Sequence, residues 1–152
     1  MDHPIFDFLD DLFVAGTLIL LTSVFHAIGL DRIMAVADRY VEQAAGQSLK
    51  SHIRKIMVAV FCIIGIFFLI TLHIWLWALT YMLLQVQELK TLEDCVYFST
   101  VTFTTLGFGD IVLKDQWRVL SGIEAANGIV ILGWSTAIIF DVMTTLYPRR
   151  RH

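Results

Sequence analysis

Charged residues are scarce in this 152-residue sequence: Asp, Glu, Lys and Arg make up only 16% of it, whereas hydrophobic residues make up 57%. The mean hydropathy is +0.73. Ordinary soluble domains contain roughly 45–50% apolar residues, so this chain has too few polar residues for a soluble domain of its size. The composition places the chain in a membrane, and the length predicts one small domain.

The sequence also lacks the marks of several other protein classes. Its two cysteines, Cys62 and Cys95, give no disulfide framework of the secreted kind, and both are predicted to be buried free thiols. No internal repeat or low-complexity segment occurs, and no basic series at every third position indicates a voltage sensor. No basic stretch with a cleavage site opens the chain, so we expect the N-terminus to be retained. We expect no nucleic-acid partner and no soluble regulatory domain.

Three long apolar segments predict three membrane-spanning helices. The first, Leu12 to Leu30, is uncharged and, at about 1.5 Å per residue, long enough to cross a hydrocarbon core of about 30 Å. The second, 56–87, exceeds this thickness, which predicts tilt or an extension beyond the bilayer. The third covers 118–147 and is followed by a basic tail, 148–152.

Residues 31–55 form a polar connector between the first two spans. Apolar residues recur in it at three- and four-residue spacing, which is typical of an amphipathic helix that lies on the membrane surface or continues the first span. These residues are Ile33, Val36, Ala37, Tyr40, Val41 and Ala44. Gly46-Gln47-Ser48 is predicted to end this helix. We interpret 1–30 as an extracellular N-terminus with the first span, and 31–55 as a cytoplasmic connector.

A short helix is predicted over 92–103. Thr91 and Asp94 have the spacing of a capping box, and acidic residues in the first turn complement the positive end of a helix. The segment is too short to cross a membrane, so we predict a re-entrant helix whose C-terminal end points toward the middle of the membrane. Backbone at that depth must be buried in protein or line water.

The run that follows this short helix is Thr104-Thr105-Leu106-Gly107-Phe108-Gly109-Asp110. A T-x-G-[YF]-G-D pattern after a short helix, with a span on each side, resembles the selectivity filter of the potassium-channel family. The resemblance implies a pore domain made of an outer helix (56–87), a pore helix (92–103), a filter (104–110) and an inner helix (118–147). One such loop per chain implies a homotetramer surrounded by membrane lipid.

The residues of the filter suit a dehydrated monovalent cation. A ring of backbone carbonyls from several chains replaces the water shell of K⁺ without placing a full charge in the site. Successive carbonyls that point one way need unusual backbone dihedrals, which Gly107 and Gly109 adopt at low cost. The expected K⁺ ligands are the carbonyls of Thr105, Leu106, Gly107 and Phe108. Asp110 is expected at the outer mouth, where a carboxylate attracts cations. Apart from the permeant K⁺, no cofactor is expected.

Two departures from the family concern the support of the filter. Phe108 stands where tyrosine is commoner, and Tyr97-Phe98 stand where many relatives have two tryptophans. Because phenylalanine has no hydroxyl, the hydrogen-bonded cuff around the filter is expected to be partly apolar. We predict that the Tyr97 hydroxyl bonds Asp110 and replaces part of this cuff, with Thr104 as a further supporting residue.

Four residues of the inner helix are candidates for gating or for lining the pore: Glu124, Asn127, Gly128 and Asp141. An ionisable residue within a span is costly, and three interpretations of Glu124 stay open: an acid bonded to the pore helix, a pore-lining charge and a proton sensor. Gly128, with Gly133 as an alternative, is either a hinge or a point of close helix packing. Asp141 is either part of a carboxylate ring at the cytoplasmic mouth or a solvated residue.

Two histidines, His26 and His73, fall within the first two spans. We interpret His26 as a packed or interface-facing residue rather than a proton relay. A cofactor role for His73 is disfavoured because nothing else in its span could ligate a metal. An intramembrane enzyme built on these histidines and Glu124 is disfavoured too, since they lie on different spans without ligand spacing.

The basic residues predict the orientation. Five Lys or Arg residues in 31–55 and three in the tail oppose three on the other side, and the positive-inside rule makes the first side cytoplasmic. The N-terminus and the filter are then outside and the C-terminus is cytoplasmic, in a multi-pass protein of the cell membrane.

The sequence therefore predicts an all-α membrane protein with three transmembrane helices, a re-entrant pore helix and a filter loop. The predicted function is that of a potassium-selective channel subunit and not of an enzyme. A nonselective monovalent cation channel is the alternative. A potassium transporter subunit is disfavoured, because such subunits are much longer and have four loops in one chain.

Overall fold

The structure of the protein is a computed structural model that describes residues 4–43, 49–114 and 117–147. Within these residues the chain is all-helical and contains no strand, as predicted. Three helices are long and apolar enough to cross a membrane, and their candidate spans are Leu12–Tyr40, Leu49–Leu83 and Trp117–Leu146. The predicted fold class is confirmed.

The first helix, α1, runs without a break over Pro4–Gln43. The sequence placed the end of the first span at Leu30 and left open whether the amphipathic segment after it continues the span; the helix does continue through these charged residues. It does so because the charges lie on its exposed side, whereas Leu30 and Ala37 remain buried. At about 1.5 Å per residue, 40 residues give a length of about 60 Å, roughly twice the hydrocarbon core of a bilayer.

The second helix, α2, covers Leu49–Leu83, so it begins and ends earlier than the predicted 56–87. Its end has a physical cause: Gln85 adopts a left-handed conformation with φ +52°, and the amides of Gln85 and Val86 donate to the carbonyls of Met82 and Tyr81. This is a Schellman motif. This motif usually contains glycine. Because no glycine stands at this position, nothing in the sequence indicated that α2 ends here.

The segment 31–55 is therefore not one connector, because 31–43 belongs to α1 and 49–55 to α2. The predicted break at Gly46-Gln47-Ser48 lies outside the described residues, as does the basic tail 148–152.

The short helix α3 occupies Leu92–Phe103, the residues expected for the pore helix. Its capping box is formed: the Asp94 amide donates to Thr91 Oγ1 at 3.0 Å, and the Thr91 amide donates to Asp94 Oδ2 at 3.0 Å. The last helix, α4, covers Trp117–Leu146. The free thiols of Cys62 and Cys95 are both buried, as expected.

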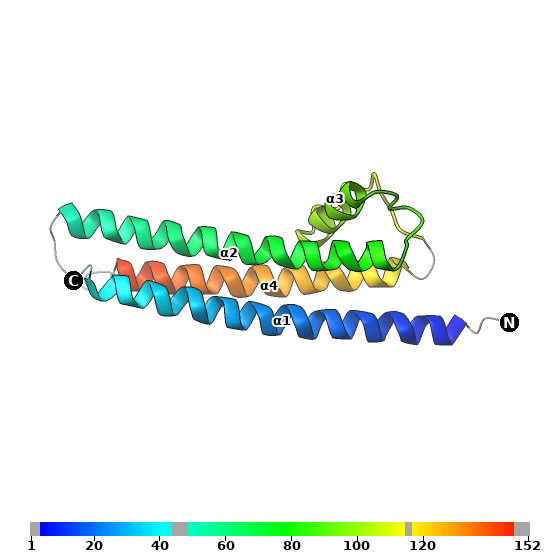
Figure 1. The fold of residues 1–152 in the computed structure, drawn as a ribbon, viewed down its shortest axis with the longest axis horizontal. Coiled ribbons are helices and arrows are strands. Elements are labelled where there is room, and N and C mark those ends of the chain that lie inside the picture. Colours follow the sequence, from blue (N-terminus) through cyan, green and yellow to red (C-terminus); the bar gives the residue numbers. More distant parts are fainter. Residues whose placement is uncertain (1–3, 44–48, 115–116, 148–152) are drawn as a thin grey trace.

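The three long helices lie side by side, and α3 stands at an angle near one end of the bundle (Figure 1). α3 packs against α2 and α4, whereas α1 packs on the other side of this pair. The loop between α3 and α4 lies at the same end as the start of α1 (Figure 1).

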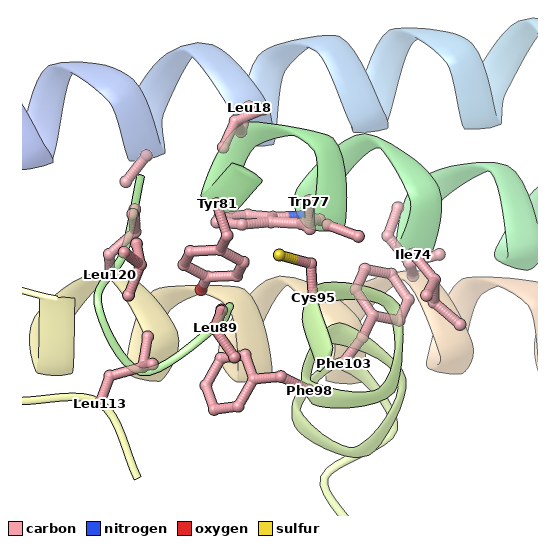
Figure 2. Close-up of a cluster of buried hydrophobic side chains, with 14 residues drawn as sticks. Leu18, Ile74, Trp77, Tyr81, Leu89, Cys95, Phe98, Phe103, Leu113 and Leu120 are labelled. Carbon is pink, nitrogen blue, oxygen red and sulfur yellow. The ribbon is translucent and has the colours of Figure 1, made fainter. Parts of the chain in front are cut away.

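A hydrophobic core surrounds α3. Figure 2 shows side chains from all four helices gathered there, among them Leu18 of α1, Trp77 and Tyr81 of α2, Phe103 of α3 and Leu120 of α4. A second cluster joins α1, α2 and α4 at the opposite end of the bundle and contains Ala37, Val58, Ala59, Cys62, Val142 and Leu146. The core around α3 fixes the segment that follows this helix.

Candidate functional site

The predicted filter, residues 104–110, is bonded to the end of α3. The amides of Thr104, Thr105 and Gly107 donate to the carbonyls of Thr100, Thr102 and Val101 at 3.1, 2.9 and 3.1 Å. The Thr104 hydroxyl also donates to the Thr100 carbonyl, at 2.6 Å. The last carbonyls of a helix have no partner within the helix, and here the filter itself supplies their donors.

Along the backbone of the filter, every second residue has a positive φ. Thr105, Gly107 and Gly109 have φ values of +60°, +49° and +80°, whereas Leu106 and Phe108 do not have positive φ. Such alternation is what a row of carbonyls on one side of a chain requires. A Cβ at Gly107 or Gly109 would meet no atom within 4 Å, so in the protomer these glycines are needed for conformation and not for space. Thr105 has a Cβ, and a left-handed conformation costs such a residue roughly 1–2 kcal/mol.

The filter residues from Thr105 to Asp110 are all exposed on the protomer. Leu106 is 59% exposed and Phe108 is 67% exposed. Large apolar side chains are thus exposed next to a backbone that is strained at Thr105.

The outer end of the filter is tied back to α3. The Tyr97 hydroxyl donates to Asp110 Oδ2 at 2.6 Å, which is the hydrogen bond expected from the sequence. This bond lowers the pKa of Asp110 below its ordinary 3.8 and raises the pKa of Tyr97 above its ordinary 10. The carboxylate is therefore charged at neutral pH, and the phenol is neutral and able to donate.

Glu124 of α4 is fully buried behind the filter, among α2, α3 and α4. The Tyr81 hydroxyl donates to Glu124 Oε2 at 2.8 Å. Ser99 of α3 is a neighbour of the carboxyl group, but Glu124 Oε1 and Ser99 Oγ have no partner at hydrogen-bond distance among the described residues. Of the three interpretations of Glu124, the buried acid agrees with this position, but the hydrogen bond that the structure shows goes to Tyr81 of α2 and not to the pore helix.

Asn127 and Gly128 also face the interior of the protomer. Asn127 is 5% exposed and donates from Nδ2 to Thr22 Oγ1 of α1 at 2.9 Å. A Cβ at Gly128 would overlap the carbonyl oxygen of Phe103, the last residue of α3. Gly128 is thus a point of close backbone packing, where the end of α3 rests on α4.

Asp141 lies at the edge of the exposed face of α4 and is itself exposed. The same exposed face carries Ile129, Val130, Gly133, Ala137 and Phe140. The structure therefore separates the four inner-helix candidates, because three are buried inside the protomer and Asp141 is exposed.

A buried polar cluster joins α1 to α2 and α4, and sequence reasoning missed it. His73 Nε2 lies 3.1 Å from the Thr22 carbonyl, and His26 Nε2 lies 3.1 Å from Ser135 Oγ. The two imidazole rings are 5.3 Å apart, edge to face. Each of these residues is a lone polar side chain in an apolar span, so the sequence showed that it was buried but not which partner it has.

The described residues contain no group of three or more His, Cys, Asp or Glu side chains that could hold a metal ion. The two histidines therefore have no further ligand of this kind beside them. Backbone carbonyls remain the candidate ligands for a monovalent cation in this structure.

Residues 56–145, more than half of the chain, match the model of a protein family described as ion channel. The match begins in α2 and ends in α4, so it contains α3 and the filter and leaves α1 outside. No curated protein and no solved structure matches the chain.

Proposed function

The chain belongs to the ion channel family, and from this premise we propose that it is the pore-forming subunit of a channel that conducts K⁺ passively. The proposed ligands are the backbone carbonyls of four filter residues, Thr105, Leu106, Gly107 and Phe108, with Gly109 completing the run. The protein would need no cofactor other than the ion it conducts, and it would catalyse no reaction.

One observation carries this proposal: positive φ values recur at Thr105, Gly107 and Gly109, in a segment bonded to the end of a buried short helix. A plain turn between two helices has no reason to alternate in this way. Carbonyl oxygens aimed at one line replace the water of a K⁺ ion, and several chains are needed to surround it. The exposure of the filter and of one face of α4 supports a homotetramer with these surfaces turned inward.

The proposed orientation puts the filter outside the cell and the end of α4 at the cytoplasm. It is supported by the basic residues of α1 and α2 near the end opposite the filter. In this arrangement Asp141 would lie near the cytoplasmic mouth, where four carboxylates raise the local concentration of cations.

The test is K⁺ flux into liposomes that contain the purified protein, compared with a Gly107→Ala variant. Alanine at φ +49° is strained, at roughly 1–2 kcal/mol per residue, and the strain is repeated in each subunit. We expect K⁺ flux in the wild type and its loss in this variant.

Gly16→Ala is the matched control, because a Cβ at Gly16 meets nothing within 4 Å and the residue lies in α1, far from the filter in the sequence. It should conduct like the wild type. Equal flux in Gly107→Ala and Gly16→Ala would remove the filter from the proposal. Equal permeation of Na⁺ and K⁺ would replace it with a nonselective cation channel.

A further inference from the structure

Helix α1 lies outside the family match, yet one of its fully buried polar residues is bonded to both neighbouring helices. Thr22 is fully buried. Its hydroxyl donates to the Leu18 carbonyl at 2.8 Å within α1 and accepts from Asn127 Nδ2 of α4 at 2.9 Å. Its carbonyl lies 3.1 Å from His73 Nε2 of α2. Since a carbonyl only accepts, His73 carries its proton on Nε2 and donates this bond.

Asn127, which bonds the Thr22 hydroxyl, lies next to the point where the end of α3 packs on α4. Asn127 is followed by Gly128, whose missing side chain leaves room for the Phe103 carbonyl. The His73 ring meets the Phe103 ring at 6.2 Å, edge to face. The two residues bonded to Thr22 therefore border the end of α3 from α2 and from α4.

The end of α3 leads directly into the filter. Phe103 is followed by Thr104 and Thr105, and Thr105 is the first residue with a positive φ. Measured along α4 from Trp117, Gly128 lies about 16 Å into the helix at about 1.5 Å per residue, a little over a third of the helix length. A shift of α4 at Asn127 would move the support of the pore helix at the inner end of the filter.

We propose that α1 is a positioning element of the pore: the Thr22 hydroxyl holds Asn127, and with it the part of α4 on which the pore helix rests, and so stabilises the conducting form of the filter. This inference rests on the proposed function. Thr22 and Asn127 act through the pore helix and touch no ion.

The test compares Thr22→Val with Thr22→Ser in single-channel recordings of the full-length protein in bilayers. Valine has nearly the shape of threonine but cannot accept from Asn127, whereas serine keeps the hydroxyl. The loss of one buried hydrogen bond in a subunit corresponds to a change of about fivefold in the equilibrium it supports. We therefore expect openings of Thr22→Val to be shorter by at least about fivefold, with an unchanged unitary conductance, and Thr22→Ser to restore long openings.

Thr17→Val is the matched control. Thr17 lies in the same helix and its hydroxyl donates to the Phe13 carbonyl at 2.8 Å, but it is exposed. The control removes the same kind of bond within α1 without touching α4. If Thr22→Val and Thr17→Val had the same open times, the proposal would be wrong.

A second measurement does not depend on conduction. Hydrogen exchange of the amides in 101–107 should be faster in Thr22→Val than in Thr17→Val, while exchange in the second core near Val142 stays the same. Equal exchange in the two variants would overturn the inference even if the wild type proved silent, and silence itself would count against the proposed function alone.

A second variant covers the case in which Thr22→Val fails to assemble. Asn127→Leu removes the donor from the other side of the same bond and should shorten openings similarly. Where both variants fold, the double variant should lose no more than either single one, because both remove one interaction. Full additivity of the two effects would contradict the proposal.

Discussion

Gly128 and Gly107 are glycines for two different physical reasons. At Gly128 the helix is regular but a side chain would overlap the Phe103 carbonyl. At Gly107 there is space for a side chain, but φ is +49°. The sequence left hinge and packing open for Gly128, and the contact with Phe103 supports packing.

Gly128→Ala should therefore prevent correct packing of α3 on α4. Overpacking costs typically 1–3 kcal/mol and more where the obstacle is backbone, and in the proposed homotetramer the effect would be repeated in each subunit. We expect a lower yield of assembled protein and a lower Tm in detergent. Gly133→Ala is the control, since a Cβ there meets nothing within 4 Å. A Gly128→Ala variant that assembles with normal stability and altered gating would support a hinge instead.

The bond between Tyr97 and Asp110 leads to a second prediction at this scale. The ring of Phe108 has no hydroxyl and cannot donate a hydrogen bond. The bond from Tyr97 therefore links the outer end of the filter to α3. Tyr97→Phe should conduct at first and lose conduction faster than the wild type. Tyr40→Phe, an exposed tyrosine of α1, is the control. Equal rates of loss in the two variants would show that the bond does not support the filter.

The same bond predicts a pH dependence. The pKa of Asp110 is lowered in the folded protein, so the stabilisation is complete above its ordinary value of 3.8 and is lost as the pH falls through the lower folded value. The pKa of Tyr97 is raised above 10, so its donation persists until the pH exceeds that raised value. In the wild type, the time for which conduction lasts should be constant between the folded pKa values of Asp110 and Tyr97. It should shorten at pH values below the folded pKa of Asp110, and Tyr97→Phe should not show this shortening in acid.

At the scale of elements, a polar contact joins α2 to α4 beside the apolar core that packs against α3. Tyr81 of α2 reaches Glu124 of α4 behind the helix, and its ring lies 5.4 Å from that of Phe98 of α3. A buried carboxyl group without partners is costly, so the tyrosine hydroxyl is as important as its ring.

Tyr81→Phe should destabilise the protein by about 1–3 kcal/mol, because Glu124 then loses the hydrogen bond to its Oε2. Glu124→Gln keeps an acceptor for Tyr81 and should cost less. The measurement is thermal unfolding of the two variants in the same detergent. If Glu124→Gln were the more damaging change, the charge rather than the hydrogen bond would be what α3 needs.

Elements differed in how well the sequence predicted them, for local reasons. α3 was predicted to the residue because Thr91 and Asp94 mark its start and the threonines before Gly107 mark its end. The end of α2 was predicted too late because Gln85 takes the left-handed position usually held by glycine. The extent of α1 was left open, because the helical spacing in its charged second half suits either a helix on the membrane surface or a continuation of the first span, and the structure shows the continuation.

The contacts of the site also differ in how well the sequence predicted them. The filter and the Tyr97–Asp110 bond follow from a local motif and from residues 13 positions apart. The bond between Thr22 and Asn127 joins residues 105 positions apart. A single threonine in one span and a single asparagine in another leave no pattern that pairs them, so only the folded chain shows the contact.

At the scale of the whole molecule, the described protomer leaves apolar surface of two kinds. Side chains such as Phe13 and Phe67 on the long helices are 77% and 67% exposed, as a lipid-facing surface requires. The filter and one face of α4 are exposed as well, and a row of carbonyls cannot surround an ion from one side. The protomer is therefore incomplete as a pore, and a symmetric assembly is its expected form.

The reversal potential of the wild-type channel in a planar bilayer tests the central claim most directly. With mostly K⁺ on one side and mostly Na⁺ on the other, the proposed carbonyl ligands predict a reversal near the K⁺ equilibrium potential. A reversal near zero in equal concentrations of the two salts would contradict potassium selectivity and leave a cation pore with a loosened filter.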